Sequence, residues 1–369
     1  MSPLAEAKRL VVKVGSALLV RQDGSIDQDW LKALCFDVAQ HRQSGREVIL
    51  VTSGAIAVGR QPLGLGSGAL RLEEKQAAAA TGQIRLAHAY QQALATHGLC
   101  CAQVLITIDD SENRRRFLNA RNTLNTLLRL GAVPVINEND TVATQEIRFG
   151  DNDRLAARVA QMVGADTLVL LSDIDGLYSA DPRKHPDARF IPEIFDLTPE
   201  IEAMAGDPGS AVGTGGMVTK LQAARIALGA GCRMAIAPGK ALRPLHAMET
   251  GRCTWFYPSL APLTARKQWI GGSIQPQGRL TVDGGAALAL AKGGSLLPAG
   301  IRAVEGAFHK GDAVVVVDDQ GRELARGLAA YGADEARRLM RRKSGDFESL
   351  LGYRGPDEMI HRDDLVLTA

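Results

Sequence analysis

Short apolar runs alternate with stretches of helical spacing over the first two-thirds of the chain, and this alternation constrains the fold more than any other feature. The runs are rich in β-branched residues and end in Gly, Ser, Asn or Asp, which is typical of strands buried on both faces. Strands separated by helices favour an α/β fold with a mostly parallel central sheet sandwiched by helices. We expect strands at 10–15, 47–55, 102–107, 132–140, 167–178 and 233–239, and helices at 28–43, 75–96, 119–130, 153–163 and 219–229.

The sequence pattern changes after about residue 258. A stretch with several Gly and Pro residues follows, and from residue 278 short alternating patterns are separated by tight turns. This pattern predicts a small β-rich barrel or sandwich that ends in a helix around 334–343. We therefore expect a large domain over 1–258, a linker over 259–277 and a second domain over 278–369.

Composition excludes several function classes. The 43 Lys and Arg residues nearly balance 41 Asp and Glu residues, so the chain as a whole has no strong attraction to nucleic acid or to an anionic membrane. The N-terminal residues contain no apolar run long enough for a signal peptide or a membrane span. The five cysteines are scattered without CxxC spacing, which argues against a disulfide framework or a zinc site. We expect a cytoplasmic protein.

Polar clusters follow several of the expected strands. They read "KVGS", "TSGA", "NEND" and "SDIDG". Because open α/β sheets bind ligands beyond the carboxyl ends of their strands, we expect these clusters to line one pocket.

A glycine-rich stretch, "GSAVGTGGMVTK", ends at Lys220 just before an expected helix. It is not a Walker A loop, because Leu221 stands where that motif needs Ser or Thr. Glycines still allow successive N–H groups to converge on an anion, and a helix beginning near Thr219 adds its positive end. The stretch alone is equally typical of a surface loop that leads into an ordinary helix.

Lys13 lies inside an apolar strand and favours the phosphate interpretation. Burying a lysine is costly unless an anion meets it, although a lysine at a strand end can also reach solvent. Phosphoryl transfer needs positive charge around the transferred group, and two lysines need a carboxylate between them. Asp151 and Asp153 in "GDNDR" could supply it, and Asp151 is equally consistent with a helix N-cap.

Seven stretches occur together in one order between about residues 8 and 258: "VVKVGS", "VTSGAIAVG", "RFLNARNTL", "PVINENDTVAT", "FGDNDRLAA", "GLYSADPR" and "GTGGMVTKLQAA". Together they resemble the amino acid kinase family, and within it the glutamate 5-kinase branch, which catalyses the first step of proline biosynthesis. The segment "VDGGA…SLLPAGI…GAF…GDAVVVVD" looks like the PUA domain that bacterial members carry. The resemblance covers nearly the whole chain.

The resemblance implies a role for each matching residue. Lys13 and Lys220 would contact the ATP phosphates and the transferred group, and Asp153 would orient the two lysines. The backbone around Gly15 and Gly54 would face the phosphates and the γ-carboxylate. Glutamate would be bound by Ser53, Asp140 and Asn152, and the nucleotide by Lys13, Ser172, Asp173, Thr214, Gly215, Gly216, Met217, Val218, Thr219 and Lys220.

The sequence departs from the family at two of these positions. Members often have Thr at the position of Ser172, so this chain keeps a hydroxyl there. They often have Ser at the position of Val218, so this chain lacks a hydroxyl there. A side-chain contact to the nucleotide from Val218 is therefore not expected, while backbone contacts remain.

The resemblance also implies the reaction and its partners. The γ-carboxylate of L-glutamate would attack the γ-phosphorus of ATP in line, with Mg²⁺ carried on the nucleotide and no metal site in the protein. The carboxylate is already ionised, and none of the seven histidines falls in a strand-end cluster, so no general base is expected. Further implied properties are feedback inhibition by proline, a dimer or tetramer, and a downstream glutamyl-phosphate reductase. We expect the segment 141–150 to act as a lid and inhibitor sensor, because it joins two clusters assigned to the substrate.

Two alternatives remain open. A sister enzyme such as N-acetylglutamate kinase, aspartokinase or a uridylate kinase would share the fold, although an acid at Asp140 disfavours a substrate with a blocked amine. An RNA-binding protein is the other alternative, because PUA domains often bind RNA. Residues 278–369 contain 13 Lys and Arg against 14 Asp and Glu, which disfavours it, and the run "RRLMRRK" is the one local exception.

Overall fold

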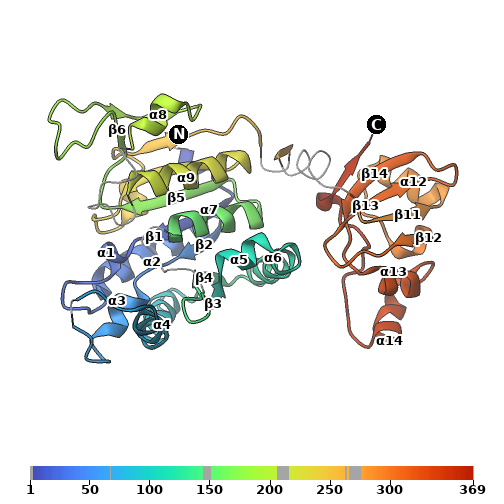
Figure 1. The fold of residues 1–369 in the computed structure, drawn as a ribbon, viewed down its shortest axis with the longest axis horizontal. Helices are drawn as coiled ribbons and strands as arrows, with labels where there is room; N and C mark the ends of the chain where they lie inside the picture. Colours follow the sequence, from blue (N-terminus) through green and yellow to red (C-terminus); the bar gives the residue numbers. More distant parts are fainter. Residues whose placement is uncertain are drawn as a thin grey trace. The chain divides into compact units, whose positions relative to one another are not determined.

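The structure is a computed structural model of the 369-residue chain. It describes residues 3–66, 68–143, 151–205, 216–261, 264–265 and 276–368. The chain divides into two compact units, which are described separately (Figure 1). Unit 1 comprises Met1–Glu112 and Asn119–Pro262, and unit 2 comprises Asn113–Leu118 and Leu263–Ala369. Most of the linker expected over 259–277 lies outside the described residues, and the domain boundaries stay predictions.

An eight-stranded sheet forms the centre of unit 1, in the order β3-β4-β2-β1-β5-β9-β10-β8. Strands β3 through β9 in that order pair in parallel, while β10 runs antiparallel to β9 and parallel to β8. The mostly parallel sheet predicted from the sequence is therefore confirmed. Its strands are β1 (Arg9–Val14), β2 (Glu47–Val51), β3 (Cys101–Ile106), β4 (Val133–Glu138), β5 (Thr167–Ser172), β8 (Glu193–Ile194), β9 (Arg233–Pro238) and β10 (Thr254–Phe256).

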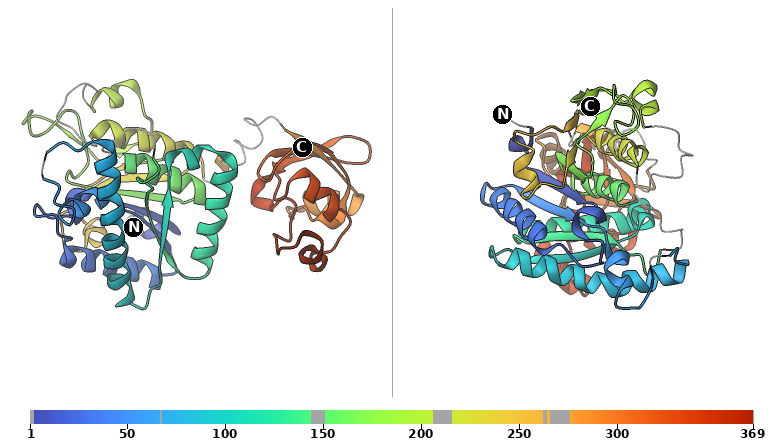
Figure 2. Two further views of the ribbon diagram at one scale, coloured as in Figure 1. Left: turned by 60° about the horizontal axis from the view of Figure 1, so that its bottom comes forward. Right: turned by 90° about the vertical axis from the view of Figure 1, so that its left-hand side faces the viewer.

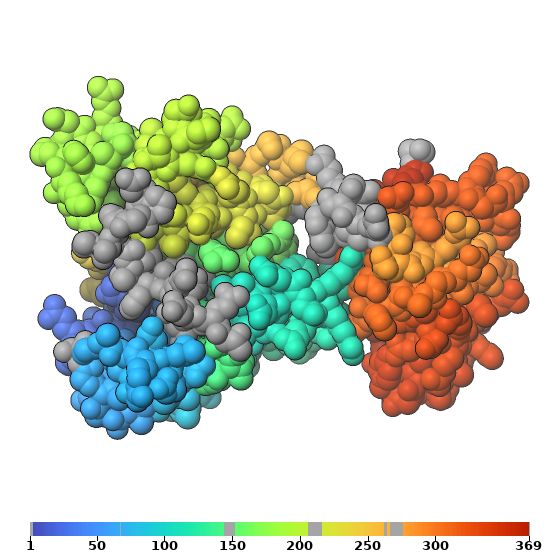
Figure 3. All heavy atoms as spheres, viewed as in Figure 1, coloured from blue at the N-terminus to red at the C-terminus, as the bar shows by residue number. Residues whose placement is uncertain are grey.

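Helices cover both sides of this sheet (Figure 2). On one side α2 packs against β2 and α4, and on the other α7 packs against β1 and β5 while α9 packs against α7 and β9. Helices α4 and α9 form much of the surface of unit 1 on the face drawn in Figure 3. The α-helices are α1 (Ser16–Leu19), α2 (Gln28–Gln43), α3 (Ala55–Arg60), α4 (Leu72–Ala95), α5 (Ile108–Glu112), α6 (Arg114–Arg129), α7 (Asp151–Val163), α8 (Pro199–Ala203), α9 (Met217–Gly229) and α10 (Pro244–Ala247).

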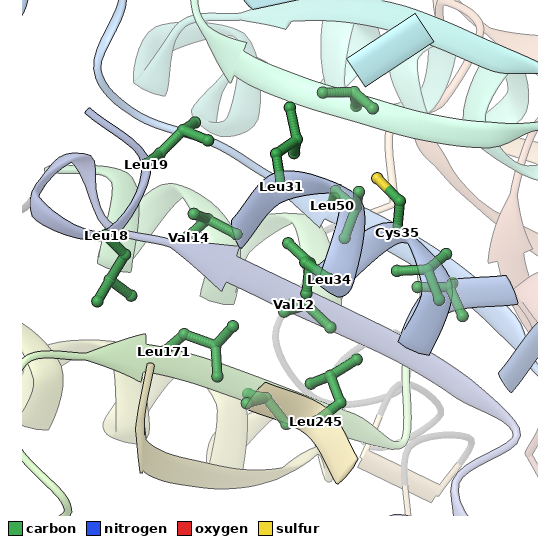
Figure 4. Packing of buried hydrophobic residues seen from close by; sticks show 14 of the residues in the cluster. Val12, Val14, Leu18, Leu19, Leu31, Leu34, Cys35, Leu50, Leu171 and Leu245 are labelled. Atoms are coloured by element: carbon green, nitrogen blue, oxygen red, sulfur yellow. The ribbon is translucent and has the colours of Figure 1, made fainter. Parts of the chain in front are cut away.

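Successive side chains of β1 point to opposite faces of the sheet, so alternate residues contact the helices on different sides. Val12 and Val14 belong to the buried cluster that includes Leu31 and Leu34 of α2, as the close-up in Figure 4 shows. Lys13 lies between them in sequence and therefore points to the opposite side of the sheet, where α7 packs. Lys13 is thus a charged side chain between apolar neighbours, while Arg9, the other charged residue of the strand, begins it.

Two expected strands end at least four residues earlier than predicted. The run over 47–55 is strand only to Val51, because Gly54 adopts a left-handed φ of +104° and α3 begins at the next residue. The run over 167–178 splits into β5 and the two-residue β6 (Leu177–Tyr178), which pairs with β7 (Phe190–Ile191). Gly176, with a φ of +155°, lies between them and has no room for a side chain, because a Cβ there would overlap with Thr254.

Unit 2 contains a five-stranded sheet in the order β12-β11-β13-β14-β15. Strands β11 and β13 are parallel, and the other pairs are antiparallel. The β-rich second domain is therefore confirmed. Its elements are β11 (Gly278–Val282), α12 (Gly284–Ala291), β12 (Ile301–Gly306), β13 (Ala313–Val317), β14 (Glu323–Leu328), α13 (Ala333–Leu339), α14 (Phe347–Leu351) and β15 (Leu365–Leu367).

The helix expected over 334–343 as the last element is shorter than predicted and is not the last element. Helix α13 ends at Leu339, because Met340 is extended with a ψ of 137° and Arg341 has a left-handed φ of 65°. The backbone N–H of Arg341 instead donates to the carbonyl oxygen of Pro298 at 2.9 Å. Strand β15, not this helix, is the last element, and it pairs with β14.

Candidate active site

Lys13 is held in the sheet by its neighbours on both sides. It pairs in register with Val51 of β2 and Leu170 of β5, so its backbone lies in the middle of the parallel strands. The residue is only 8% exposed, and its Nζ lies 2.7 Å from Oδ1 of Asp153 on α7. The carboxylate expected from the cost of burying a lysine is thus present.

Asp153 also meets the helix that follows the glycine-rich stretch. Lys220 Nζ donates to Oδ2 of Asp153 at 3.2 Å, and the hydroxyl of Thr219 lies 3.1 Å from the same oxygen. Thr219 also lies within 2.9 Å of the carbonyl oxygen of Gly216, which precedes α9. The first turn of α9 and the first turn of α7 are thereby joined through one carboxylate.

Asp153 is completely buried, and its ionisation follows from its two partners. Burial raises the pKa of the carboxyl group, but the ammonium groups of Lys13 and Lys220 outweigh burial, so the pKa lies below its usual value. The carboxylate is therefore ionised at neutral pH. Two lysines and one carboxylate leave one net positive charge in a buried place, and such a place favours a bound anion.

A second group of contacts surrounds Asn152, the residue before this carboxylate. Its Nδ2 donates to the carbonyl oxygen of Thr52 at 2.7 Å, to Oγ of Ser53 at 2.8 Å and to Oδ1 of Asn137 at 3.0 Å. The end of β2, the end of β4 and the start of α7 are joined at this amide. Ser53 and Asn152, expected together from the sequence, do lie in contact.

Sequence reasoning did not assign a role to Asn137. It is 2% exposed, and besides meeting Asn152 its own Nδ2 donates to Oε1 of Gln83 on α4 at 2.7 Å. The signal was available, because Asn137 begins the "NEND" cluster at the end of an apolar strand. Gln83, in contrast, had no sequence signal, since it lies inside a helix.

The remaining expected site residues lie at the same carboxyl edge. Asp140 is buried just after β4. Ser172 ends β5, and its hydroxyl donates to Oδ1 of its exposed neighbour Asp173 at 3.2 Å. Gly15 follows β1, and a Cβ there would lie 3.8 Å from the Nζ of Lys13, so the strand end approaches the lysine closely.

Some expected positions lie outside the described residues. They are Thr214 and Gly215 of the nucleotide site, most of the predicted lid (residues 144–150), and the side chain of Asp151. Gly216, Met217, Val218, Thr219 and Lys220 are described and form the approach to α9 and its first turn.

The described residues provide neither a metal-binding cluster nor a membrane-spanning helix. No group of three or more His, Cys, Asp and Glu side chains there could hold a metal ion. Among the helices in the described ranges, none combines the length and apolar character needed to cross a membrane.

Comparison with known proteins decides the family. The model of the amino acid kinase family matches residues 8–238, which include the buried cluster of Lys13, Asp153 and Lys220. The chain belongs to the amino acid kinase family. A model of the PUA domain matches residues 278–351, within unit 2.

Relatives within this family are similar along the whole chain. A protein of Paramagnetospirillum magneticum named glutamate 5-kinase is 68% identical over 369 residues, covering 100% of both chains. Proteins with the same name from Rhodospirillum rubrum and Agrobacterium fabrum are 64% and 58% identical, over 97% and 99% of this chain and 96% and 94% of their own lengths. A solved structure of carbamate kinase from Giardia lamblia bound to AMP-PNP has a TM-score of 0.50 at 17% identity, covering 69% of this chain and 100% of that chain. That likeness shows the amino acid kinase fold alone.

Proposed function

We propose that the chain is a glutamate 5-kinase, which transfers the γ-phosphoryl group of ATP to the γ-carboxylate of L-glutamate. The products are γ-glutamyl 5-phosphate and ADP, and the reaction is the first step of proline biosynthesis. The observation that carries this conclusion is the 68% identity, over the full length of both chains, to a relative of that name. The buried lysine–aspartate–lysine cluster supplies the chemistry that such a reaction needs.

The two lysines stabilise negative charge on the transferred group. The ammonium groups of Lys13 and Lys220 lie 2.7 and 3.2 Å from oxygens of the shared carboxylate. In the proposed reaction the positive charge of both lysines stabilises the phosphate oxygens, whose negative charge is spread over the transferred group during phosphoryl transfer. Asp153 holds both lysines in place before the substrates arrive, so little reorganisation is needed at the moment of reaction.

The bond changes need no general base. An oxygen of the ionised γ-carboxylate attacks the γ-phosphorus, and the new O–P bond forms as the bond to the ADP oxygen breaks. The electron pair of that bond leaves with ADP, and no proton has to move. Mg²⁺, when bound on the nucleotide, would neutralise part of the phosphate charge.

Ser53, Asn152 and Asp140 are proposed to bind glutamate. The hydroxyl of Ser53 accepts a hydrogen bond from Asn152 Nδ2, so its own proton can be donated to a substrate carboxylate. Asp140 is buried two residues after the end of β4, and its carboxylate would pair with the α-ammonium group. An N-acetylated substrate has no ammonium group to pair with this carboxylate. The assignment therefore disfavours N-acetylglutamate kinase as the activity of this chain.

The nucleotide is assigned to the neighbouring strand end and helix. Ser172 and Asp173 follow β5, and the backbone from Gly216 to Lys220 enters α9, whose first N–H groups favour a phosphate. The proposed nucleotide site also includes Thr214 and Gly215. Val218 contributes through its backbone only.

Further properties belong to the same proposal. Proline would inhibit by competing at the glutamate site, the chain would assemble as a dimer or tetramer in the cytoplasm, and a glutamyl-phosphate reductase would consume the labile product. RNA binding by the second domain is disfavoured by the near balance of charges over residues 278–369.

An acyl-phosphate assay tests the proposed function. The purified chain is incubated with MgATP, hydroxylamine and, in parallel, L-glutamate, N-acetylglutamate or L-aspartate, and hydroxamate is measured. The proposal expects hydroxamate with L-glutamate alone, and its loss in a Lys220→Ala variant. Hydroxamate with another acid in place of glutamate would move the chain to a sister kinase of the same family.

A further inference from the structure

Helix α4 presents three polar side chains at intervals of seven residues: Gln76, Gln83 and Tyr90. Seven residues are close to two turns of an α-helix, so the three lie on one face of α4. Elsewhere this helix buries mainly small and apolar residues, such as Ala79 and Leu86. We call these three residues the α4 polar row.

The two ends of the α4 polar row contact residues in the segments that follow β2 and β4. Gln76 Nε2 donates to the carbonyl oxygen of Ala143, which follows β4, at 3.1 Å. The hydroxyl of Tyr90, which is fully buried, donates to Oγ1 of Thr52 at 3.0 Å. Thr52 is also the residue whose carbonyl oxygen accepts from Asn152. One helix therefore supports the ends of both β2 and β4.

The middle residue of the row meets the site through a chain of amides. Because Asn152 Nδ2 donates to a backbone carbonyl, Asn137 must turn its Oδ1 toward Asn152. The Nδ2 of Asn137 then points away, and Gln83 Oε1 accepts from it at 2.7 Å. Asn137 is 2% exposed, so without this acceptor a buried amide N–H would lose its partner.

We propose that Gln83 is a positioning residue for glutamate binding, acting through Asn137 and Asn152 without touching the substrate. The inference rests on the proposed function, because it assigns Asn152 to glutamate. In the described contacts Asn152 uses only Nδ2, so its Oδ1 is the atom that would accept from the substrate ammonium. Gln83 keeps Asn137 in the rotamer that holds Asn152 in this orientation.

Three variants test this role in the full-length chain by steady-state kinetics with glutamate and ATP varied separately. Gln83→Met keeps the side-chain length but removes the acceptor, whereas Gln83→Glu keeps an acceptor oxygen. Gln91→Met is the matched control, because Gln91 is exposed on the same helix. We expect Gln83→Met to raise KM for glutamate about 10-fold, as the loss of one buried hydrogen bond implies. KM for ATP and kcat should stay close to those of the control, and Gln83→Glu should restore most of the glutamate affinity.

A second measurement asks whether Gln83 acts through Asn137. If it does, Gln83→Met should have little additional effect on KM for glutamate in an Asn137→Leu background, because the two changes break the same chain of contacts. Full additivity would overturn the inference. So would a Gln83→Met variant that matches Gln91→Met, or one that raises the KM values for glutamate and ATP equally.

The outcomes separate this inference from the proposed function. A wild-type chain that phosphorylates glutamate, with a Gln83→Met variant unchanged, overturns the positioning role alone. A wild-type chain inactive on glutamate overturns the proposed function and the inference with it.

Discussion

Replacing Asp153 by Asn removes the one negative charge between two buried lysines while keeping nearly the same shape. Its carboxylate oxygens lie 2.7 Å from Lys13 Nζ and 3.2 Å from Lys220 Nζ. At an effective dielectric constant of about 20, these distances correspond to gross attractions of about 6 and about 5 kcal/mol. The desolvation cost offsets much of this, and removing one partner of a buried ion pair typically costs about 3 to 5 kcal/mol.

Part of that cost should appear in catalysis, because the two ammonium groups then repel each other and leave the positions that favour the transferred group. A loss of about 3 to 4 kcal/mol of transition-state stabilisation corresponds to a decrease in kcat of about 10²- to 10³-fold. The assay is hydroxamate formation at saturating glutamate and MgATP, with thermal unfolding measured on the same preparation.

Asp37→Asn is the matched control for this variant. Asp37 is also a buried carboxylate with a cationic partner, since Arg243 Nε lies 2.8 Å from its Oδ1, but it lies on α2 on the other side of the sheet. This control should lose stability and keep kcat within about 3-fold of the wild type. A folded Asp153→Asn variant with kcat as high as that of Asp37→Asn would refute the reasoning.

Three further predictions also concern unit 1. Gly82→Ala should destabilise the chain by about 1 to 3 kcal/mol in urea unfolding, because a Cβ there would overlap with the carbonyl oxygen of Ala55 where α3 crosses α4; an unchanged midpoint would contradict this close packing. Ser53→Ala should raise KM for glutamate about 10-fold and leave KM for ATP unchanged, because the hydroxyl is assigned to a substrate carboxylate; equal changes in both constants would count against that assignment. The pKa of Asp153 is lowered by its lysines, so its stabilising contribution is present above the unfolded-state pKa of about 4 and is lost as pH falls through the folded-state pKa. The difference in unfolding free energy between the wild type and Asp153→Asn should therefore narrow in acid, and a difference that stays constant into strong acid would contradict this.

Periodicity predicted the framework of unit 1 well, because buried strands and helices leave a strong local pattern. The helix expected over 28–43 coincides with α2 at both ends. Errors arose where a turn or a distant contact ended an element. Gly54 ended one strand early, and the hydrogen bond from Arg341 to Pro298 stopped a helix that the local sequence favoured.

The charged part of the site was predictable for a physical reason. A lysine within an apolar strand requires an anion, and Asp153 was a candidate at the start of a helix. The neutral part was harder to predict, because amides such as Asn137 and Gln83 carry no charge that demands a partner. Their pairing joins residues far apart in the sequence and becomes visible only once β4, α4 and α7 are packed together.

Isotope transfer from the substrate carboxylate tests the central claim most directly. Glutamate labelled with ¹⁸O in the γ-carboxylate is converted in the presence of MgATP, and hydroxylamine releases phosphate from the acyl phosphate by attack at carbon. If the γ-carboxylate attacks phosphorus, the released phosphate carries one ¹⁸O atom, and glutamate labelled only in the α-carboxylate gives unlabelled phosphate. Unlabelled phosphate from the γ-labelled substrate would contradict the account.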